Sequence, residues 1–419
     1  MQYILKYGKG KIALSLPENA NVTVIEPRHA QPLEDPLGEF SRALNSPLSC
    51  PRFEDMTAPG SIAIAVPDET RPFPTKLLLP PLLEKIFRTY PDLPHERVTI
   101  VVGGGLHPRP DEAQLSRILP EDLQGCRVVS HDAQTSPMRH MGVTSRGTPV
   151  EINAAYADAD LKIVMGMVDI HQFVGCTGGA KGVVVGCASA NMITHSHSMM
   201  TRDEAYAGNI ATNPVRLDMN EAGEIAGVRV AVNVVLTSDK QIAALFVGNP
   251  AAVLEKAALM TKSLYGQRLE RPFDIVIASC GGYPKDICLY QAQKALDACR
   301  HCVAPHGKIL LLAQCAQGIG DERYEKYVER FHSQEELMEN FRHSKFVMGA
   351  HKAFLFARAA LNHEVILHTD LPESDLKRCL LRKGDAQTAV DAWLEENPKM
   401  TVGILTYANS TFFLQDGKS

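Results

Sequence analysis

The sequence predicts an α/β protein made of two Rossmann-like domains with mainly parallel sheets, and three observations support this prediction. The chain has 419 residues, which exceeds the ~150 residues that one domain commonly uses. Short apolar runs alternate with helical patterns, as they do where helices cover both faces of a parallel sheet. A second run of this kind begins after Arg271-Pro272. We therefore expect domains at 1–270 and 271–419, with the active site in the cleft between them.

The individual elements follow from hydropathy and turn residues. Residues 2–26 read as short strands with a turn at Gly8-Lys9-Gly10. Further strands are expected at 62–66, 98–102, 127–130, 161–168, 273–279, 308–313, 365–368 and 401–405, with a hairpin at 228–247. Helices are expected within 33–51 and 321–361, and at 75–90, 111–119, 250–266 and 287–302.

Composition and charge exclude several classes of protein. Apolar residues make up 45% and charged residues 22% of the chain, as in ordinary soluble proteins. The net charge of −5 and the scattered basic residues give no sign of a nucleic-acid or membrane partner. No apolar run approaches the ~20 residues of a membrane helix, and residues 1–16 lack a signal-peptide core. We expect a cytoplasmic protein.

The ten cysteines are expected to be reduced thiols, mostly in cores. Cys299 and Cys302 form a CxxC pair, but no second pair stands at the spacing of a zinc site. Two small apolar residues in a helix explain this pair more simply than a metal or redox role does.

Four polar residues follow predicted strands, namely Asp68, Arg71, His107 and His171. Ligands of parallel sheets bind at the carboxyl ends of strands, so these four form a candidate site. Two imidazoles suit acid/base work on either face of a stereocentre, and Arg71 suits a carboxylate. Structural strand-end histidines and an exposed ion pair of Arg71 remain the simpler alternatives.

A glycine-rich stretch, Gly175 to Gly182, presents Lys181. It resembles a phosphate loop, G-x-x-x-x-G-K-[ST], but Ala180 replaces the last glycine and Gly182 replaces the hydroxyl residue. Lys181 is therefore a phosphate cation, a covalent attachment point or a solvated loop lysine. Two more histidines follow, His195 and His197, and on a helix they would differ by about 200° in direction, so only one can face a pocket.

The second predicted domain offers another polar group. Tyr290 and Lys294 are four residues apart and share a helix face, with Gln291 adjacent. A phenol, an amide and an ammonium at one helix start suit a hydroxy acid. A solvated amphipathic helix would look the same.

These residues carry a resemblance to a known family. The chain resembles the nickel-dependent lactate racemases and related α-hydroxyacid racemases and epimerases over nearly its whole length. Lys181 follows His171 by ten residues and His197 follows Lys181 by sixteen, as in the family. The other shared motifs are Asp68-Glu69-Thr70-Arg71-Pro72, Gly105-Leu106-His107, Gly178-Gly179-Ala180-Lys181, Asn191 to His197, Gly281-Gly282-Tyr283-Pro284, Tyr290-Gln291 and Lys294.

The resemblance implies a cofactor, the nickel-pincer nucleotide (pyridinium-3,5-bisthiocarboxylic acid mononucleotide nickel), which dedicated cofactor-synthesis proteins supply. Lys181 would carry it through a thioamide, near Gly178 and Gly179, and His197 would be a nickel ligand, which square-planar nickel accepts. Asp68 would orient Arg71 or the cofactor. His195 takes no role.

The resemblance also implies the reaction, inversion at C2 of a small 2-hydroxy acid. One of the paired bases, His107 or His171, would take the hydroxyl proton while the C2 hydride moves to the cofactor and later returns to the other face. The substrate would contact Arg71, with the group around Lys294 (Tyr290, Gln291 and Lys294) nearby.

One position departs from the lactate enzymes and bears on the substrate. Those enzymes carry a tryptophan before a Phe-Ala-Arg, whereas here the corresponding residue is His351, before Phe356-Ala357-Arg358. An imidazole in place of a large apolar side chain favours a longer or more polar substrate such as malate, 2-hydroxyglutarate or a sugar acid. Two alternatives stay open, a phosphate- or nucleotide-binding enzyme of the same fold and a non-catalytic protein that binds a hydroxy acid or the cofactor.

Overall fold

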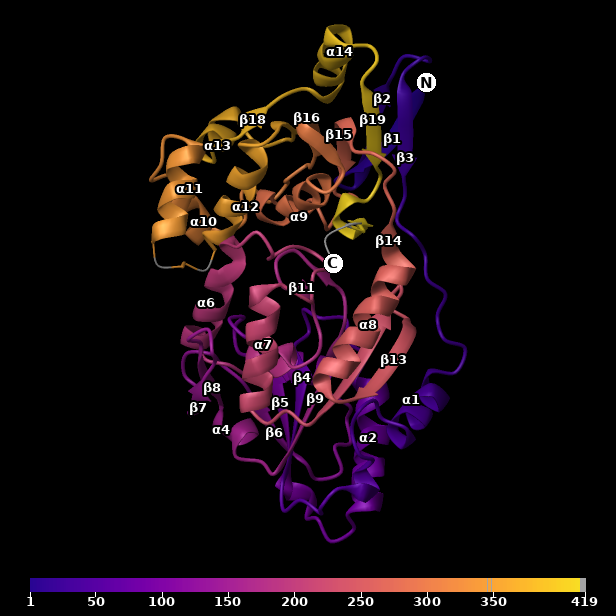
Figure 1. Cartoon of the computed structure of the whole chain (residues 1–419), viewed down its shortest axis with the longest axis vertical. Coiled ribbons are helices and arrows are strands. Elements are labelled where there is room, and N and C mark those ends of the chain that lie inside the picture. The colour runs from indigo at the N-terminus through magenta and orange to yellow at the C-terminus, as the bar shows by residue number, and fades with distance from the viewer. Residues whose placement is uncertain (345, 348, 415–419) are drawn as a thin grey trace. The chain divides into compact units, whose positions relative to one another are not determined.

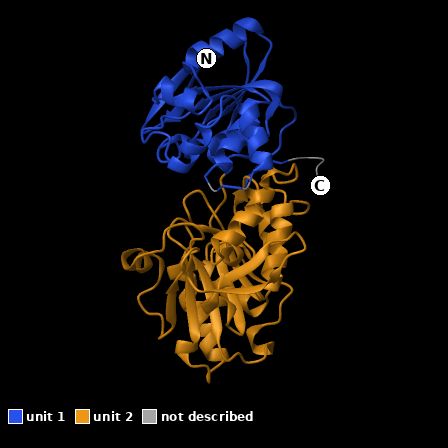
Figure 2. Ribbon diagram, turned by 90° about the vertical axis from the view of Figure 1, so that its left-hand side faces the viewer, with its two compact units in different colours: residues 1–28, 265–419 blue, residues 29–264 orange. Residues whose placement is uncertain are grey.

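The computed structural model describes residues 1–344, 346–347 and 349–414. The chain folds into two compact units (Figure 2). Unit 1 combines residues 1–28 with residues 265–419, and unit 2 comprises residues 29–264. Each unit contains one six-stranded sheet (Figure 1), which confirms the predicted α/β class with two mainly parallel sheets.

Unit 2 is built on a sheet with the strand order β13-β12-β9-β4-β5-β6. Every neighbouring pair is parallel except β12 with β13, which form the predicted hairpin. The strands are β4 (Ile62–Pro67), β5 (Val98–Gly103), β6 (Arg127–Ser130), β9 (Leu161–Met167), β12 (Val230–Leu236) and β13 (Ile242–Gly248). Two small antiparallel pairs accompany it, β7 (Met138–Val143) with β8 (Pro149–Asn153) and β10 (Ile170–His171) with β11 (Gly175–Cys176).

The helices of this unit connect the strands. They are α1 (Pro36–Asn45), α2 (Thr75–Thr89), α3 (Glu112–Ile118), α4 (Ala154–Ala157), α5 (Lys181–Val184), α6 (Ala190–Ser198), α7 (Pro214–Ile225) and α8 (Pro250–Tyr265). Short 3₁₀ turns lie at Phe53–Asp55, His95–Arg97 and Met199–Thr201. Asn213 starts α7 by accepting hydrogen bonds from the backbone N–H groups of Val215 (3.0 Å) and Arg216 (3.3 Å), an ordinary N-cap.

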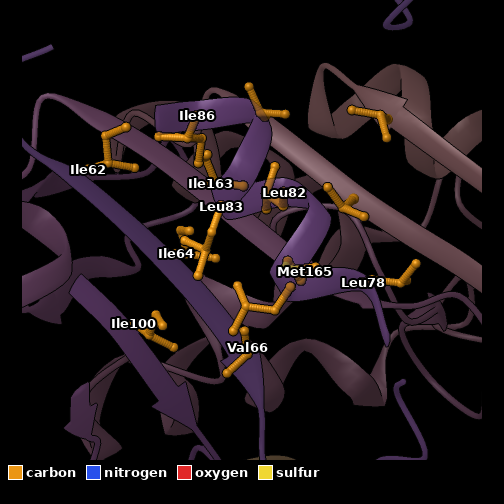
Figure 3. Close-up of a cluster of buried hydrophobic side chains, with 14 of the residues drawn as sticks. Ile62, Ile64, Val66, Leu78, Leu82, Leu83, Ile86, Ile100, Ile163 and Met165 are labelled. Atoms are coloured by element: carbon orange, nitrogen blue, oxygen red, sulfur yellow. The ribbon is translucent and has the colours of Figure 1, made fainter. Parts of the chain in front are cut away.

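Alternation along the strands separates the two faces of this sheet. Ile62, Ile64 and Val66 of β4 point into a core that α2 covers (Figure 3). Burying each such side chain contributes about 1.5–3 kcal/mol. Val164 of β9 points to the opposite face, because its neighbours Ile163 and Met165 belong to this core. Gly182 of α5 packs on that opposite face, where a Cβ on it would be only 2.7 Å from Cγ2 of Val164. The sheet is therefore packed on both faces, and the loops at its carboxyl edge are built on it.

Unit 1 has a second sheet with the order β18-β17-β16-β15-β19-β3, in which all neighbours are parallel. Its strands are β3 (Asn21–Ile25), β15 (Phe273–Ser279), β16 (Val303–Leu312), β17 (Glu364–His368), β18 (Arg382–Lys383) and β19 (Thr401–Leu405). The shorter pairs are β1 (Gln2–Tyr7) with β2 (Gly10–Ser15) and β14 (Gly266–Gln267) with β20 (Phe412–Phe413).

The helices of unit 1 are α9 (Leu289–Cys299), α10 (Glu322–Val328), α11 (Gln334–His343), α12 (His351–Ala360), α13 (Glu373–Arg378) and α14 (Ala386–Glu396), with a 3₁₀ turn at Ala408–Ser410. The core joins the β1–β2 hairpin, through Leu5 and Leu14, to Ile275, Ile277 and Trp393. No helix among the described residues has the length and apolar character needed to cross a membrane.

The N-terminus departs from the expected domain at 1–270. Residues 1–28 fold with the C-terminal part of the chain, since β3 pairs in parallel with β19 from Asn21 opposite Thr401 to Ile25 opposite Leu405. The expected boundary near Arg271 lies close to Tyr265, where the chain re-enters unit 1. Strand pairing at this distance in sequence leaves no local signal, so the pattern of residues 2–26 predicted strands but not their partner. The cleft between the domains stays a prediction.

Candidate active site

Three predicted site residues lie at the carboxyl edge of the unit 2 sheet. Asp68 and Arg71 follow β4, and His107 follows β5, its neighbour in the sheet. The register of β4 and β5 pairs Pro67 with Gly103, which brings the two loops to one level. The arrangement is the one expected for parallel strands, whose carboxyl ends share an edge.

Asp68 and His107 form a hydrogen-bonded pair. His107 Nδ1 lies 2.7 Å from Oδ2 of the buried Asp68, and the Thr70 hydroxyl donates to Oδ1 at 2.7 Å. Burial raises the pKa of Asp68, but the hydrogen bonds from His107 and Thr70 outweigh it and hold that pKa below the usual value. An ionised Asp68 fixes Nδ1 as the protonated nitrogen of a neutral His107 and leaves Nε2 as a base. Asp68 thus contacts His107, and the charge of Arg71 also helps to lower the pKa of Asp68, whereas its expected role in orienting Arg71 or the cofactor stays a prediction.

His171 and His197 both pack against one aromatic ring, that of Phe173. His171, in β10, packs edge-on against Phe173 with 4.7 Å between ring centroids, and His197 of α6 meets the same ring at 5.3 Å. The backbone N–H of Val174 donates to His171 Nδ1 at 3.4 Å, which leaves the proton of a neutral ring on Nε2. His195 instead lies 2.8 Å from the Thr148 hydroxyl, so the two histidines of α6 have different neighbours, as the helical spacing requires.

The glycine-rich loop ends in Lys181, the first residue of α5. Gly178 (φ +87°) and Gly179 (φ +58°) both adopt left-handed backbone conformations. A Cβ on Gly178 would lie 2.3 Å from Cγ2 of Val168, so no larger residue fits. Asn233 of β12 accepts the Gly179 N–H at 2.8 Å. These contacts set the direction in which Lys181 leaves the loop.

Burial and neighbouring cations shift the titration of this group. Burial, followed by the charges of Arg71 and Arg216, lowers the pKa of Lys181 to about 7. Burial and the nearby Lys181 lower the pKa of His197 to about 3. Burial, with Lys181 and His197, holds the pKa of His171 well below its usual value. At neutral pH both imidazoles are therefore neutral and much of the Lys181 amine is free to act as a nucleophile.

A cavity of about 90 Å³ opens between these loops. Its lining includes six of the predicted site residues, namely Asp68, Arg71, His107, Gly178, Gly179 and Lys181. An adjacent cavity of about 440 Å³ shares Asp68 and Arg71 and adds the basic residues Lys76 and Arg117. Unit 2 therefore places Lys181, His107 and Arg71 around one cavity.

The remaining predicted residues gather in unit 1, around α9 and α12. The Tyr290 and His351 rings meet edge-on with centroids 6.2 Å apart. Lys352, buried beside them, donates to Gln293 Oε1 at 2.7 Å, and its Nζ lies 5.6 Å from the Tyr290 ring centroid. Lys294 is close enough to lower the pKa of Lys352, although burial is the larger cause. Gln291 lies on the same first turn of α9.

Other features of the sequence take a structural place. Cys299 ends α9 and Cys302 lies in the turn after it, and both thiols are buried with pKa values raised by burial. The sequence also left three contributors to the site unassigned, namely Phe173, Arg216 and Asn233. Asn233 lies within β12, whose other residues are all apolar, and this single polar residue was the signal that the sequence offered.

Comparison with known proteins agrees with this geometry. Residues 7–208 match the lactate racemase N-terminal domain, and residues 269–400 match the lactate racemase C-terminal domain. The chain belongs to the lactate racemase family. The lactate racemase of Lactiplantibacillus plantarum is 30% identical over 343 residues, 80% of each chain. That of Thermoanaerobacterium thermosaccharolyticum is 29% identical over 376 residues, 87% of each chain.

Solved structures extend the agreement to the fold. The lactate racemase apoprotein from Thermoanaerobacterium thermosaccharolyticum matches with a TM-score of 0.89 and 27% identity, over 99% of this chain and 100% of that one. A protein from Thermotoga maritima shares the fold with a TM-score of 0.64 and 16% identity, over 92% of this chain and 99% of its own.

Family membership makes this chain an isomerase, a racemase or epimerase of 2-hydroxy acids. Enzymes of the lactate racemase family use a nickel-pincer nucleotide. The triphosphate-loop alternative loses its support, because Lys181 begins a helix of only four residues, whereas a phosphate loop leads into a long one.

Proposed function

We propose that this member of the lactate racemase family inverts C2 of a 2-hydroxy acid with a nickel-pincer nucleotide held by Lys181 and His197. The observation that carries the proposal is the half-buried Lys181, whose amine has a lowered pKa, close enough to His171 and His197 to lower the pKa of both imidazoles. The Asp68–His107 pair stands at the edge of the same cavity.

The residues present fit this cofactor. Lys181 is the group that would form a covalent link, because its neutral amine lines the cavity. His197 is a suitable nickel ligand, because a histidine that stays unprotonated keeps a lone pair for the metal. Gly178 and Gly179 line the same cavity, and their left-handed backbone conformations bring the chain to Lys181 there. When bound, the cofactor supplies an acceptor for hydride from C2.

The chain's own residues then bind the substrate and move protons. His107 and His171 are the proposed bases, one for the hydroxyl proton of each enantiomer. The oxygen of the inverted product would receive its proton from the histidine that serves that enantiomer, and exchange with water would restore both rings. Arg71, which lines both cavities, is the proposed partner of the substrate carboxylate. Lys294, Tyr290 and Gln291 of unit 1 are proposed as further substrate contacts.

His351 supports a substrate larger or more polar than lactate. Its ring stands against Tyr290, and the buried amine of Lys352 lies 5.6 Å from the centroid of that Tyr290 ring. Malate, 2-hydroxyglutarate and sugar acids each carry an extra polar group for such surroundings. We propose this class in place of lactate.

A panel of D- and L-hydroxy acids tests the proposal. The enzyme is produced together with the cofactor-synthesis proteins, and each pure enantiomer is followed by chiral chromatography. Inversion of at least one 2-hydroxy acid is expected, with faster turnover of polar substrates than of lactate. Substrates deuterated at C2 should retain their label, because hydride and not a proton leaves C2. Free exchange of the label with water would contradict this route.

Replacing Asp68 with asparagine is expected to lower turnover by on the order of 10²- to 10⁴-fold while the protein stays folded. The amide no longer enforces the tautomer of His107 or stabilises its protonated form. The rate of inversion and the thermal unfolding midpoint measure the two effects separately. Glu69→Gln is the control, since the neighbouring Glu69 pairs with Arg117 instead. Equal losses in both variants would remove the special role of Asp68.

Replacing His197 with alanine is expected to lower bound nickel at least tenfold, whereas His195→Ala should keep it, because second-sphere and ligand changes in metal sites cost about 10- to 100-fold or more. Both residues lie on α6, but only His197 packs against Phe173. Elemental analysis of the purified proteins gives nickel per chain. Full nickel content in the His197 variant would reject it as the ligand.

A further inference from the structure

A buried guanidinium without an acidic partner lies beneath the glycine-rich loop. Arg216, in the first turn of α7, has no exposed surface. Among the described residues, no carboxylate forms a salt bridge with it and its Nε has no hydrogen-bond partner. An unpaired buried charge is costly, so an arginine here needs a reason beyond filling space.

The contacts of Arg216 give that reason. Its Nη2 donates to the carbonyl oxygen of Cys176, and its Nη1 donates to that of Gly178 at 3.4 Å. Nη1 also lies 3.4 Å from Asn220 Oδ1. Both carbonyls belong to the segment between His171 and Lys181, so one planar group binds two points of the loop.

The same helix start holds the loop at a third point. Asn213, the N-cap of α7, donates from Nδ2 to the carbonyl oxygen of Phe173 at 3.0 Å. Gly223, further along α7, lets the helix approach so closely that a Cβ there would be 2.3 Å from the Cβ of Ala180. From the other side, Asn233 holds the Gly179 N–H. The loop is fixed between α7 and β12, and Arg216 supplies the central contacts.

Charge adds a second effect. Arg216 and Arg71 both act on the Lys181 amine, and after burial they are the causes that bring its pKa to about 7. Burial also lowers the pKa of Arg216 itself, to about 10, so it stays charged at neutral pH.

We propose that Arg216 is a positioning residue for Lys181, which fixes the loop carbonyls and places a permanent positive charge near the amine. In this role Arg216 acts through the loop and by its charge, without direct contact with the substrate or with Lys181. The part that concerns cofactor loading rests on the proposed function, whereas the part that concerns the amine does not.

Two variants separate charge from geometry in the full-length chain. Arg216→Met removes the charge and both carbonyl contacts, and Arg216→Lys keeps the charge but not the planar two-point contact. Asn220→Ala is the matched control, because it removes one partner of Arg216 and leaves the loop contacts in place. Thermal unfolding first establishes which variants are folded.

The first readout uses protein made without the cofactor. Trace labelling with acetic anhydride, followed by peptide mass spectrometry, gives the pH midpoint of the Lys181 amine. We expect a midpoint near 7 in the wild type, in Asn220→Ala and in Arg216→Lys. A rise of about one pH unit is expected in Arg216→Met, which lowers labelling at pH 7 about fivefold.

The second readout is covalent loading of Lys181, measured by intact mass after production with the cofactor-synthesis proteins. Arg216→Lys should load about 10- to 100-fold more slowly, the usual cost of a displaced reactive group. Wild-type loading in Arg216→Lys overturns the positioning role even if Arg216→Met does not fold. A folded Arg216→Met with unchanged midpoint and loading overturns the proposal entirely. If the wild type never loads yet its midpoint depends on Arg216, the proposed function fails and this inference stands.

Discussion

Replacing Lys181 with arginine is expected to abolish covalent loading and to lower turnover by on the order of 10⁴-fold or more, because the cofactor carries the difficult step. Arginine keeps the positive charge and the length of the side chain, but its guanidinium stays protonated and is not a nucleophile. The amine of Lys181, in contrast, has a pKa lowered by burial to about 7. Intact-mass spectrometry of the loaded protein measures attachment directly, and chiral chromatography measures turnover.

The pH dependence of loading follows from the same shift. The neutral amine is the reactive form, so the rate of attachment should rise as pH increases through about 7 and level off above it. An ordinary solvated lysine would still gain reactivity well above that pH, since its pKa is about 10.4.

Lys162 provides the control for Lys181. It lies on β9 of the same unit and is also partly buried, with a pKa lowered by burial, yet it does not line the cavity. Lys162→Arg should therefore load and turn over as the wild type does. Added mass that persists in Lys181→Arg, or that vanishes in Lys162→Arg, would show that attachment occurs elsewhere.

The sequence predicts the site residues that follow strands of one sheet, and it does not predict those that depend on contacts between distant segments. Asp68, Arg71 and His107 follow apolar runs, and the parallel sheet then brings them to one edge without further information. Lys181 was visible because glycines surround it. Its chemistry was not, since the lowered pKa comes from burial and then from the charges of Arg71 and Arg216, which lie in distant parts of the chain.

The parts that the sequence did not predict depend on contacts between distant segments. Asn233 and Arg216 hold the loop from β12 and α7, and nothing near either residue in sequence indicates a partner around position 178. The same holds for β3, whose partner β19 lies at the far end of the chain. A local sequence pattern predicts that a strand or helix forms, whereas its packing partners are known only from the folded structure.

The paired bases make the most discriminating prediction. Each of His107→Gln and His171→Gln is expected to lower inversion by about 10²- to 10⁴-fold, the usual contribution of one acid/base group. Glutamine can hydrogen-bond but cannot accept the proton at neutral pH. The His171 base should be available throughout the neutral range, because its pKa lies well below the usual value, chiefly through burial. His140→Gln, at an exposed position of β7, is the control.

The two single variants should differ in the enantiomer whose C2–D bond they can still break. If each histidine serves one enantiomer, a single-turnover experiment with loaded enzyme and C2-deuterated substrate will show loss of deuterium from C2 of one enantiomer in His107→Gln and of the other in His171→Gln. The double variant should break the C2–D bond of neither enantiomer. Two variants that both act on both enantiomers would leave one base or none in the mechanism. If His107→Ala and His171→Ala both kept full activity, neither histidine would be a base, and this pair would at most bind the hydroxy acid or the cofactor. Another group at the carboxyl edge of the sheet would then have to move the proton.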